Sequence, residues 1–191
     1  SEIIFNEMES TYTLKRYDEN CGKVSLNVPG EHNILNSLAS AAIGFELGLS
    51  NKAVIQGLKD YRGVRRRFEI KGEVGEIMLV DDYAHHPTEV LATLETAKTS
   101  WDRRVIAVFQ PHLYSRTQEF YREFAEAMMK SDIAIITDIY PAREKPISGI
   151  TGKLIFDELK KLGHQNVFYE PELDSLTHLV SDIAKQKDLI I

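Results

Sequence analysis

The sequence predicts an α/β protein with a mainly parallel sheet, preceded by a smaller segment of strands and helices. Three observations lead to this prediction. Strand-like and helix-like stretches alternate along the chain beyond residue 67. The strand-like stretches there are short, apolar and uninterrupted, which is typical of strands covered on both faces. The first thirty residues are instead β-prone with turns between them, and an apolar pattern of helical period follows them.

The N-terminal segment is expected to begin with three short strands. A turn at residues 18–22 separates the second strand from the third, and a proline-glycine pair at 29–30 ends the third. Apolar residues then recur at helical spacing from Glu31, and Gly48 marks the end of that helix. A shorter helix is expected over residues 50–58. The expected strands span residues 3–5, 11–17 and 23–28.

Beyond a linker at residues 61–64, strands and helices are expected in alternation. Proline at position 87 suits the first turn of a helix, where a backbone N–H has no partner to lose. The last strand starts just before the chain stops, so the chain is expected to be truncated at its C-terminal end. The expected strands span residues 76–80, 104–109, 133–137, 167–169 and 188–191, and the expected helices span residues 87–98, 117–130, 152–162 and 173–185.

Composition and charge exclude several classes of protein. With 43% hydrophobic and 27% charged residues the chain resembles an ordinary globular protein. Residues 1–10 lack the apolar stretch and cleavage site of a signal peptide, and no run approaches roughly 20 apolar residues, so neither a signal peptide nor membrane insertion is expected. A net charge of −6 argues against nucleic acid as a partner. The single cysteine, Cys21, excludes a disulfide framework and fits a cytoplasmic location.

Polar loops follow three successive strands of the expected sheet. They span residues 80–88, 110–117 and 140–146, and they carry carboxylates, imidazoles and guanidinium groups. Because ligands of open α/β sheets bind beyond the carboxyl ends of the strands, these loops together predict a ligand site. In the second loop, His112 and Arg116 suit a carboxylate ligand. Positive charge for an anionic ligand is clustered in Arg62, Arg65, Arg66 and Arg67.

The first of these loops also raises the question of a metal site. Asp81, Asp82, His85 and His86 are of the types that bind metals, but adjacent side chains point in different directions. No helical pair of histidines four residues apart forces them together, so no metal site is expected. We expect instead that Asp82 bonds to a sugar hydroxyl and His85 to a substrate, whereas His86 caps the following helix.

A nucleotide site is harder to find from motifs alone. The glycine-containing stretch 149–153 fails the phosphate-loop pattern, and no GxGxxG motif follows a strand. Asn33 and Asn36 lie three residues apart in the first turn of the first helix, where their amides could pair with an adenine edge. Helix capping is the simpler alternative for both residues when only their spacing is considered.

Taken as a set, these motifs resemble the Mur ligase family. The resemblance extends in the same order over nearly the whole chain. It implies that residues 1–63 are the end of a central ATP-binding domain and that residues 64–191 are a Rossmann-like C-terminal domain, truncated at its end. The phosphate loop, the catalytic glutamate and the Mg²⁺ ligands of the family would lie upstream of this chain. The motifs that carry the resemblance are residues 30–36, 65–69, 81–87 and 110–117.

The resemblance also implies roles for individual residues. Arg67 would reach the phosphates of ATP and Asp82 its ribose, and Arg67 and His85 would be the catalytic residues. At position 113 many relatives carry arginine, whereas this chain has Leu113, so the amino-acid carboxylate would depend more on Arg116. The adenine pocket would be formed by His32, Asn33 and Asn36. The amino-acid side of the site would be lined by Tyr83, His85, His112 and Arg116.

The activity implied by the resemblance is the ATP-dependent joining of L-alanine to UDP-N-acetylmuramate through an acyl phosphate, with Mg²⁺ and positive side chains neutralising charge. Closure of the domains would use residues 61–64 as a hinge. The chain alone is expected to be inactive because it lacks the phosphate loop. Two alternatives remain open, namely a ligase that attaches a peptide to UDP-N-acetylmuramate in wall recycling and a non-catalytic nucleotide-binding module.

Overall fold

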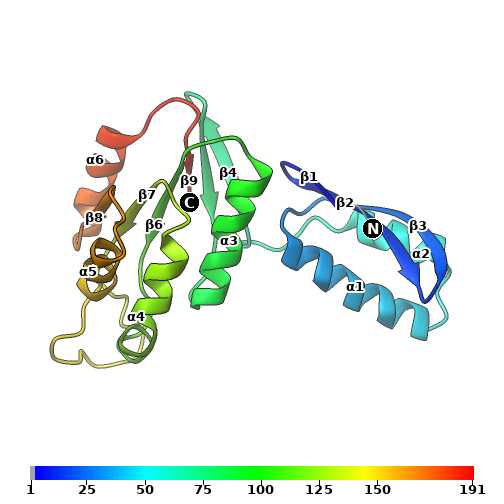
Figure 1. Cartoon of the computed structure of the whole chain (residues 1–191), viewed down its shortest axis with the longest axis horizontal. Helices are drawn as coiled ribbons and strands as arrows, with labels where there is room; N and C mark the ends of the chain where they lie inside the picture. The colour runs from blue at the N-terminus through cyan, green and yellow to red at the C-terminus, as the bar shows by residue number, and fades with distance from the viewer. Residues whose placement is uncertain (1–2) are drawn as a thin grey trace. The chain divides into compact units, whose positions relative to one another are not determined.

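The computed structural model describes residues 3–191 and divides into two compact units (Figure 1). The first unit comprises Ser1–Arg65 with Glu95–Asp102, and the second comprises Arg66–Leu94 with Arg103–Ile191. Residues 1 and 2 of the expected N-terminal domain lie outside the described range. Within that range, no helix is both long enough and apolar enough to cross a membrane. The assignment of residues 1–63 and 64–191 to two family domains stays a prediction.

The first unit contains a three-stranded antiparallel sheet. Its hairpin differs from the one expected, because Arg16 pairs with Glu19 and only Tyr17 and Asp18 form the turn. The expected turn at 18–22 was therefore wrong. Tyr17 adopts a φ of 51°, which suits a two-residue hairpin, and a bulge after Leu14 adjusts the register. The strands are β1 (Ile4–Asn6), β2 (Glu9–Arg16) and β3 (Glu19–Leu26), in that order.

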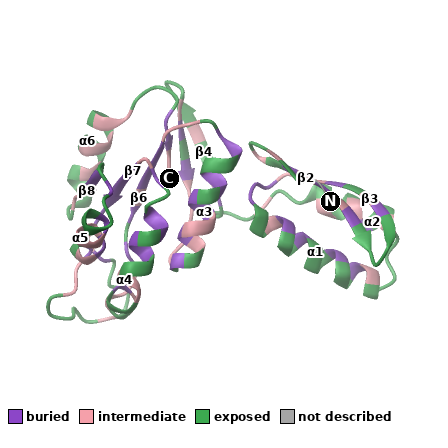
Figure 2. Cartoon of the chain, in the orientation of Figure 1, coloured by how far each residue is buried: buried purple, intermediate pink, exposed green. Residues whose placement is uncertain are grey.

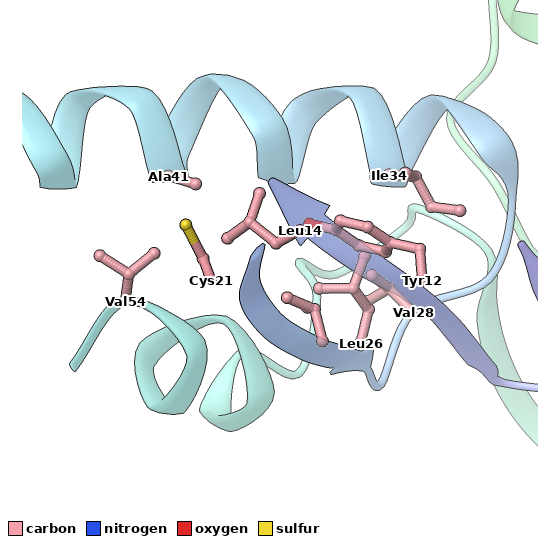
Figure 3. Close-up of a cluster of buried hydrophobic side chains, with 9 residues drawn as sticks. Tyr12, Leu14, Cys21, Leu26, Val28, Ile34, Ala41 and Val54 are labelled. Carbon is pink, nitrogen blue, oxygen red and sulfur yellow. The ribbon is translucent and has the colours of Figure 1, made fainter. Parts of the chain in front are cut away.

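Two helices, α1 (Glu31–Glu46) and α2 (Asn51–Asp60), complete this unit. The buried positions of α1 recur every three or four residues, so one face of the helix packs on the sheet. Figure 3 shows Ile34 and Ala41 of α1 above side chains from the strands. Cys21 is buried in the same cluster. The opposite face of α1 is exposed (Figure 2) and carries Leu35 and Ile43, and the exposed Leu47 follows directly after the helix.

The second unit contains a six-stranded, mostly parallel sheet in the order β4-β5-β9-β6-β7-β8, which confirms the expected α/β class. One strand, β4, was not expected from the sequence. It forms an antiparallel hairpin with β5. Gly75 and Glu76 make its turn, with φ values of 56° and 64°. The strands are β4 (Glu69–Val74), β5 (Ile77–Asp81), β6 (Val105–Phe109), β7 (Ile133–Ile136), β8 (Val167–Tyr169) and β9 (Leu189–Ile190).

Helices cover both faces of this sheet. Ile106 and Val108 of β6 face α6, whereas Phe109, which alternates with them, contacts the ring of Phe124 on α4. The helix α4 begins three residues before the expected start at Thr117, so Arg116 belongs to its first turn and not to the loop. The helices are α3 (Pro87–Ser100), α4 (Tyr114–Met128), α5 (Lys153–Lys161) and α6 (Leu173–Ile183).

Gly152→Ala is expected to destabilise the second unit by about 1–3 kcal/mol. An added Cβ would overlap the backbone carbonyl oxygen of Thr137, and backbone atoms cannot rotate away as a side chain can. Gly57→Ala in α2 is the matched control, because a Cβ added at Gly57 meets no atom within 4 Å. Alanine also has a higher helix propensity than glycine. Urea denaturation followed by circular dichroism measures the free energy of unfolding of both variants. Equal midpoints for Gly152→Ala and the unmodified chain would contradict the expected clash.

Candidate functional site

Polar side chains gather at the carboxyl ends of β5, β6 and β7 in the second unit. His112 and Tyr140 form a parallel bridge that extends the pairing of β6 with β7 beyond their last residues. The Leu113 N–H donates to the Tyr140 carbonyl at 3.0 Å, and the Tyr140 N–H donates to the Pro111 carbonyl at 2.8 Å. The loops after these two strands are thereby joined. Leu113 takes a φ of 73°, so the chain turns sharply between β6 and α4.

The two aspartates at the end of β5 brace the loop that follows, Asp81 as the last residue of the strand and Asp82 as the first residue after it. The carboxylate of Asp82 accepts the N–H of Phe68 and the N–H of Ala84, each at 2.7 Å, one on each oxygen. Asp81 pairs with Arg66 at 3.3 Å. A carboxylate oxygen has a second lone pair, so the expected bond from Asp82 to a ribose would share an oxygen that already accepts an N–H. That role of Asp82 stays a prediction.

Tyr83 and His85 lie side by side after β5, with ring centroids 5.0 Å apart. The Nδ1 atom of His85 is 2.8 Å from the Tyr83 carbonyl oxygen, which can only accept a hydrogen bond. Nδ1 therefore carries a proton, and Nε2 is the acceptor nitrogen of the neutral ring. The guanidinium of Arg66 lies 4.6 Å from the centre of the Tyr83 ring and holds this half-exposed side chain.

His112 adds a second imidazole, 6.1 Å from the ring of His85. Its ring stacks on Tyr140 with centroids 5.6 Å apart and an angle of 26°. Its Nδ1 is buried and has no hydrogen-bond partner among the described residues. Burial lowers the pKa of His112, and the charges of Arg116 and His85 lower it further, whereas Glu144 acts in the opposite direction. The ring is therefore held in its neutral form.

Arg116 and Glu144 complete this group of residues. Nη1 of Arg116 donates to the His85 carbonyl at 3.2 Å, which ties the first turn of α4 to the loop after β5. Glu144 accepts the N–H of Ser115 at 3.0 Å and its hydroxyl at 2.5 Å, and these bonds hold the pKa of Glu144 below its ordinary value. Tyr140 and Glu144 were not among the expected site residues, although both lie in the third polar loop, residues 140–146.

Arg67 is connected to the same group of residues by Glu89, which was not among the expected site residues. Both Nη atoms of Arg67 are 3.4 Å from Oε1 of Glu89, and the other oxygen of Glu89 accepts the N–H of His85 at 3.0 Å. The second unit therefore brings together every expected site residue that it contains. These residues are Arg67, Asp82, Tyr83, His85, His112 and Arg116.

The remaining expected site residues lie in the first two turns of α1, in the first unit. Asn33 and Asn36 line a cavity of about 490 Å³, together with residues of β3 and α2. The capping alternative for these asparagines is wrong, because Gly30 is the N-cap and no side chain caps α1. The Asn33 amide instead donates to the Pro29 carbonyl at 2.7 Å. His32 is exposed and does not line the cavity.

The acidic and histidine side chains of the chain do not form a metal centre among the described residues. Across residues 3–191, no group of three or more His, Cys, Asp and Glu side chains lies close enough together to hold a metal ion. Asp82 is engaged with backbone N–H groups, and His85 donates to a carbonyl. These residues instead form a site of hydrogen-bonding and charged groups.

Titration of the chain by NMR tests the environment of His112. Its pKa is expected below the ordinary value of about 6.5, so the ring takes up a proton only as the pH falls below that value. Arg116→Ala removes one opposing positive charge and is expected to raise the pKa of His112. Arg122→Ala, on the same helix, serves as the control. A His112 pKa that does not respond to Arg116→Ala would show that the two side chains are not in electrostatic contact.

Comparison with known proteins gives the wider context of this site. Residues 66–191 match the family model described as Mur ligase, glutamate ligase domain. The chain is 41% identical over all 191 residues to a UDP-N-acetylmuramate–L-alanine ligase of Geotalea daltonii, of which it covers 42%. It is 48% identical over 174 residues to a ligase of the same name from Salinibacter ruber, with 91% of the chain and 37% of that protein covered.

Solved structures give a similar result. The UDP-N-acetylmuramate–alanine ligase of Thermotoga maritima matches with a TM-score of 0.81 and 29% identity, over 99% of the chain and 40% of that protein. A murein peptide ligase of Psychrobacter arcticus shares the fold with a TM-score of 0.63 and 24% identity, over 100% of the chain and 39% of that protein. The chain thus spans about two fifths of the length of these relatives.

Proposed function

This chain belongs to the Mur ligase family, and we propose that it is the C-terminal part of an ATP-dependent ligase that joins L-alanine to UDP-N-acetylmuramate in peptidoglycan precursor synthesis. The observation that carries the proposal is the 41% identity over all 191 residues to a ligase of that name. We place the reaction in the cytoplasm, in keeping with the single cysteine of the chain.

The adenine of ATP fits the cavity that Asn33 and Asn36 line in the first unit. Its volume of about 490 Å³ exceeds that of a purine, and an asparagine amide offers both a donor and an acceptor to an adenine edge. In this proposal His32 borders the adenine pocket, Arg67 binds the phosphates and Asp82 the ribose. The phosphate loop and the Mg²⁺ ligands come from parts of the ligase outside this chain.

The L-alanine side of the reaction uses the group of residues after β5 and β6. Arg116 binds the amino-acid carboxylate, and the neutral ring of His112 and the ring of Tyr83 border the same site. His85 accepts the proton that the amine loses, through its acceptor nitrogen Nε2. When ATP is bound it supplies the phosphoryl group that activates the muramate carboxylate as an acyl phosphate. Residues 61–64 are the hinge at which the domains close.

A chimera tests this proposal directly. The chain replaces the matching 42% of the Geotalea daltonii ligase, and product and phosphate are measured with ATP, Mg²⁺ and UDP-N-acetylmuramate. L-alanine and a muropeptide-type tripeptide are supplied in separate reactions. We expect turnover with L-alanine alone and no phosphate release from the chain by itself, because the phosphate loop is missing.

Other outcomes would point elsewhere. Turnover with the tripeptide alone would assign the chain to a peptide ligase of wall recycling. A folded chimera that binds ATP but is silent with both acceptors would favour a non-catalytic nucleotide-binding module. Phosphate release by the isolated chain, in the presence of L-alanine and the UDP-sugar, would contradict the expected dependence on the missing parts.

A further inference from the structure

Glu89 is the residue on which the two expected catalytic residues converge. Its Oε1 lies 3.4 Å from both Nη atoms of Arg67. Its Oε2 accepts the backbone N–H of His85 at 3.0 Å and that of His86 at 3.2 Å. One carboxylate therefore links a guanidinium that precedes β4 to the histidine loop that follows β5.

Helix capping explains only part of this arrangement. Glu89 is the third residue of α3, and a glutamate at that position often accepts the N–H of the residue just before the helix, here His86. Capping requires neither the additional bond to the His85 N–H nor the contact with Arg67. Those two contacts involve the residues expected to act on the phosphates and on the amine.

The charge of Glu89 is maintained by the same contacts. Partial burial acts to raise the pKa of Glu89, but the His85 N–H, the charge of His85 whenever its ring is protonated, and the charge of Arg67 outweigh burial and hold the pKa below its ordinary value. The carboxylate is therefore ionised at neutral pH. The Arg67 and Glu89 side chains keep 46% and 32% of their surface exposed, so their ion pair contributes little to stability. Its main consequence is geometric, because it restricts where the guanidinium of Arg67 lies.

We propose that Glu89 is a positioning residue that fixes the Arg67 guanidinium relative to the His85 loop. This inference rests on the proposed function, because it assigns Glu89 to the reaction only through Arg67 and His85. Glu89 itself touches no substrate in this scheme. Without its charge, Arg67 adopts other rotamers and spends less time in the orientation that the phosphates require.

Glu89→Gln separates positioning from capping. Glutamine at this position still caps the helix through its amide oxygen. Its amide nitrogen then faces Arg67, and because both groups are hydrogen-bond donors the contact with Arg67 is lost. In the chimera we expect kcat to fall roughly fivefold, as for the loss of one accessible ion pair, with KM for L-alanine little changed. Asp157→Asn, which removes the exposed pair with Lys153 on α5, is the control and leaves kcat unchanged.

A double-mutant cycle with Arg67→Ala identifies the route of the effect. If Glu89 acts through Arg67, Glu89→Gln lowers kcat when Arg67 is present and has no further effect when it is absent. An equal fall in both backgrounds, or no fall in either, would overturn the proposal.

A second measurement uses the isolated chain and does not depend on activity. The line shapes of the Arg67 Nη resonances in ¹⁵N spectra report how freely its guanidinium rotates. We expect faster rotation in Glu89→Gln, while amide exchange at His86 stays slow because the cap is retained. Glu89→Ala is expected to speed up both processes. If every chimera, including the unmutated one, is inactive, the proposed function has failed, yet unchanged Arg67 line shapes in Glu89→Gln would separately overturn the role of Glu89.

Discussion

Arg67→Ala in the chimera is expected to lower kcat by about 100-fold to 1,000-fold, the cost of removing one charge-stabilising donor from a transition state. Phosphoryl transfer depends almost entirely on positioning and on charge neutralisation, so a guanidinium directed at the phosphates has a large effect. Among the described residues of the second unit, Arg67 forms one ion pair, with the partly exposed Glu89 at 3.4 Å. Its loss should therefore leave folding intact.

The control for this prediction is Arg122→Ala, which removes an arginine that packs over Tyr121 on α4. Both variants are compared with the unmutated chimera by steady-state kinetics and by thermal denaturation. We expect equal melting temperatures and a loss of kcat in Arg67→Ala alone. Unchanged kinetics in Arg67→Ala would remove this residue from the site and would also remove the basis for the role of Glu89.

The sequence predicted most of the second unit because its strands are short, apolar and separated by amphipathic helices. The buried strand Ile133–Ile136 and its neighbour Val105–Phe109 have almost no polar residues, which is typical of central parallel strands. The missed strand β4 lies at the edge of the sheet, is mostly exposed and contains Gly72. Its pattern therefore lacks the apolar run and the alternation on which strand prediction depends.

The candidate site was predicted in outline but not in its contacts. Polar loops after successive parallel strands must meet at one edge of the sheet, so His85, His112 and Arg116 could be grouped from the sequence. The sequence does not show which carboxylate contacts these residues, because that depends on distances in the folded chain. Glu89 stands three residues after His86, but histidine is not a usual capping residue, and even a capping glutamate predicts a helix start and not a contact with Arg67.

Asp188→Asn is expected to destabilise the second unit by about 3 kcal/mol, because removing one partner of a buried ion pair leaves the other charge uncompensated. Asp188 is 2% exposed. Its carboxylate accepts two hydrogen bonds from Arg104, at 2.8 and 2.5 Å, and the Lys185 N–H at 2.7 Å. The Arg104 side chain is 32% exposed, which places the effect at the low end for buried pairs. Asp188 directly precedes the short strand β9, which lies between β5 and β6, and Arg104 directly precedes β6.

Urea denaturation of the isolated chain measures this effect, with Asp157→Asn as the exposed-pair control that changes stability by less than about 0.5 kcal/mol. The pH dependence gives an independent check. Burial acts to raise the pKa of Asp188, but the bonds from Arg104 and Lys185 outweigh it and lower the pKa. A lowered folded-state pKa contributes stability above the ordinary value of about 3.9 and loses it as the pH falls towards the folded-state pKa. The difference in free energy of unfolding between the unmutated chain and Asp188→Asn should therefore become smaller below about pH 4.

Replacing both Arg104 and Asp188 separates the effect of an uncompensated charge on stability from the effect of lost packing. Arg104→Met with Asp188→Leu removes both charges and fills similar space, so it should regain much of the stability lost in Asp188→Asn. The Lys185 N–H then loses its acceptor, and that loss limits the recovery. A double variant as unstable as Asp188→Asn would mean that the backbone bond to Lys185, and not the uncompensated charge of Arg104, holds the start of β9 in the sheet.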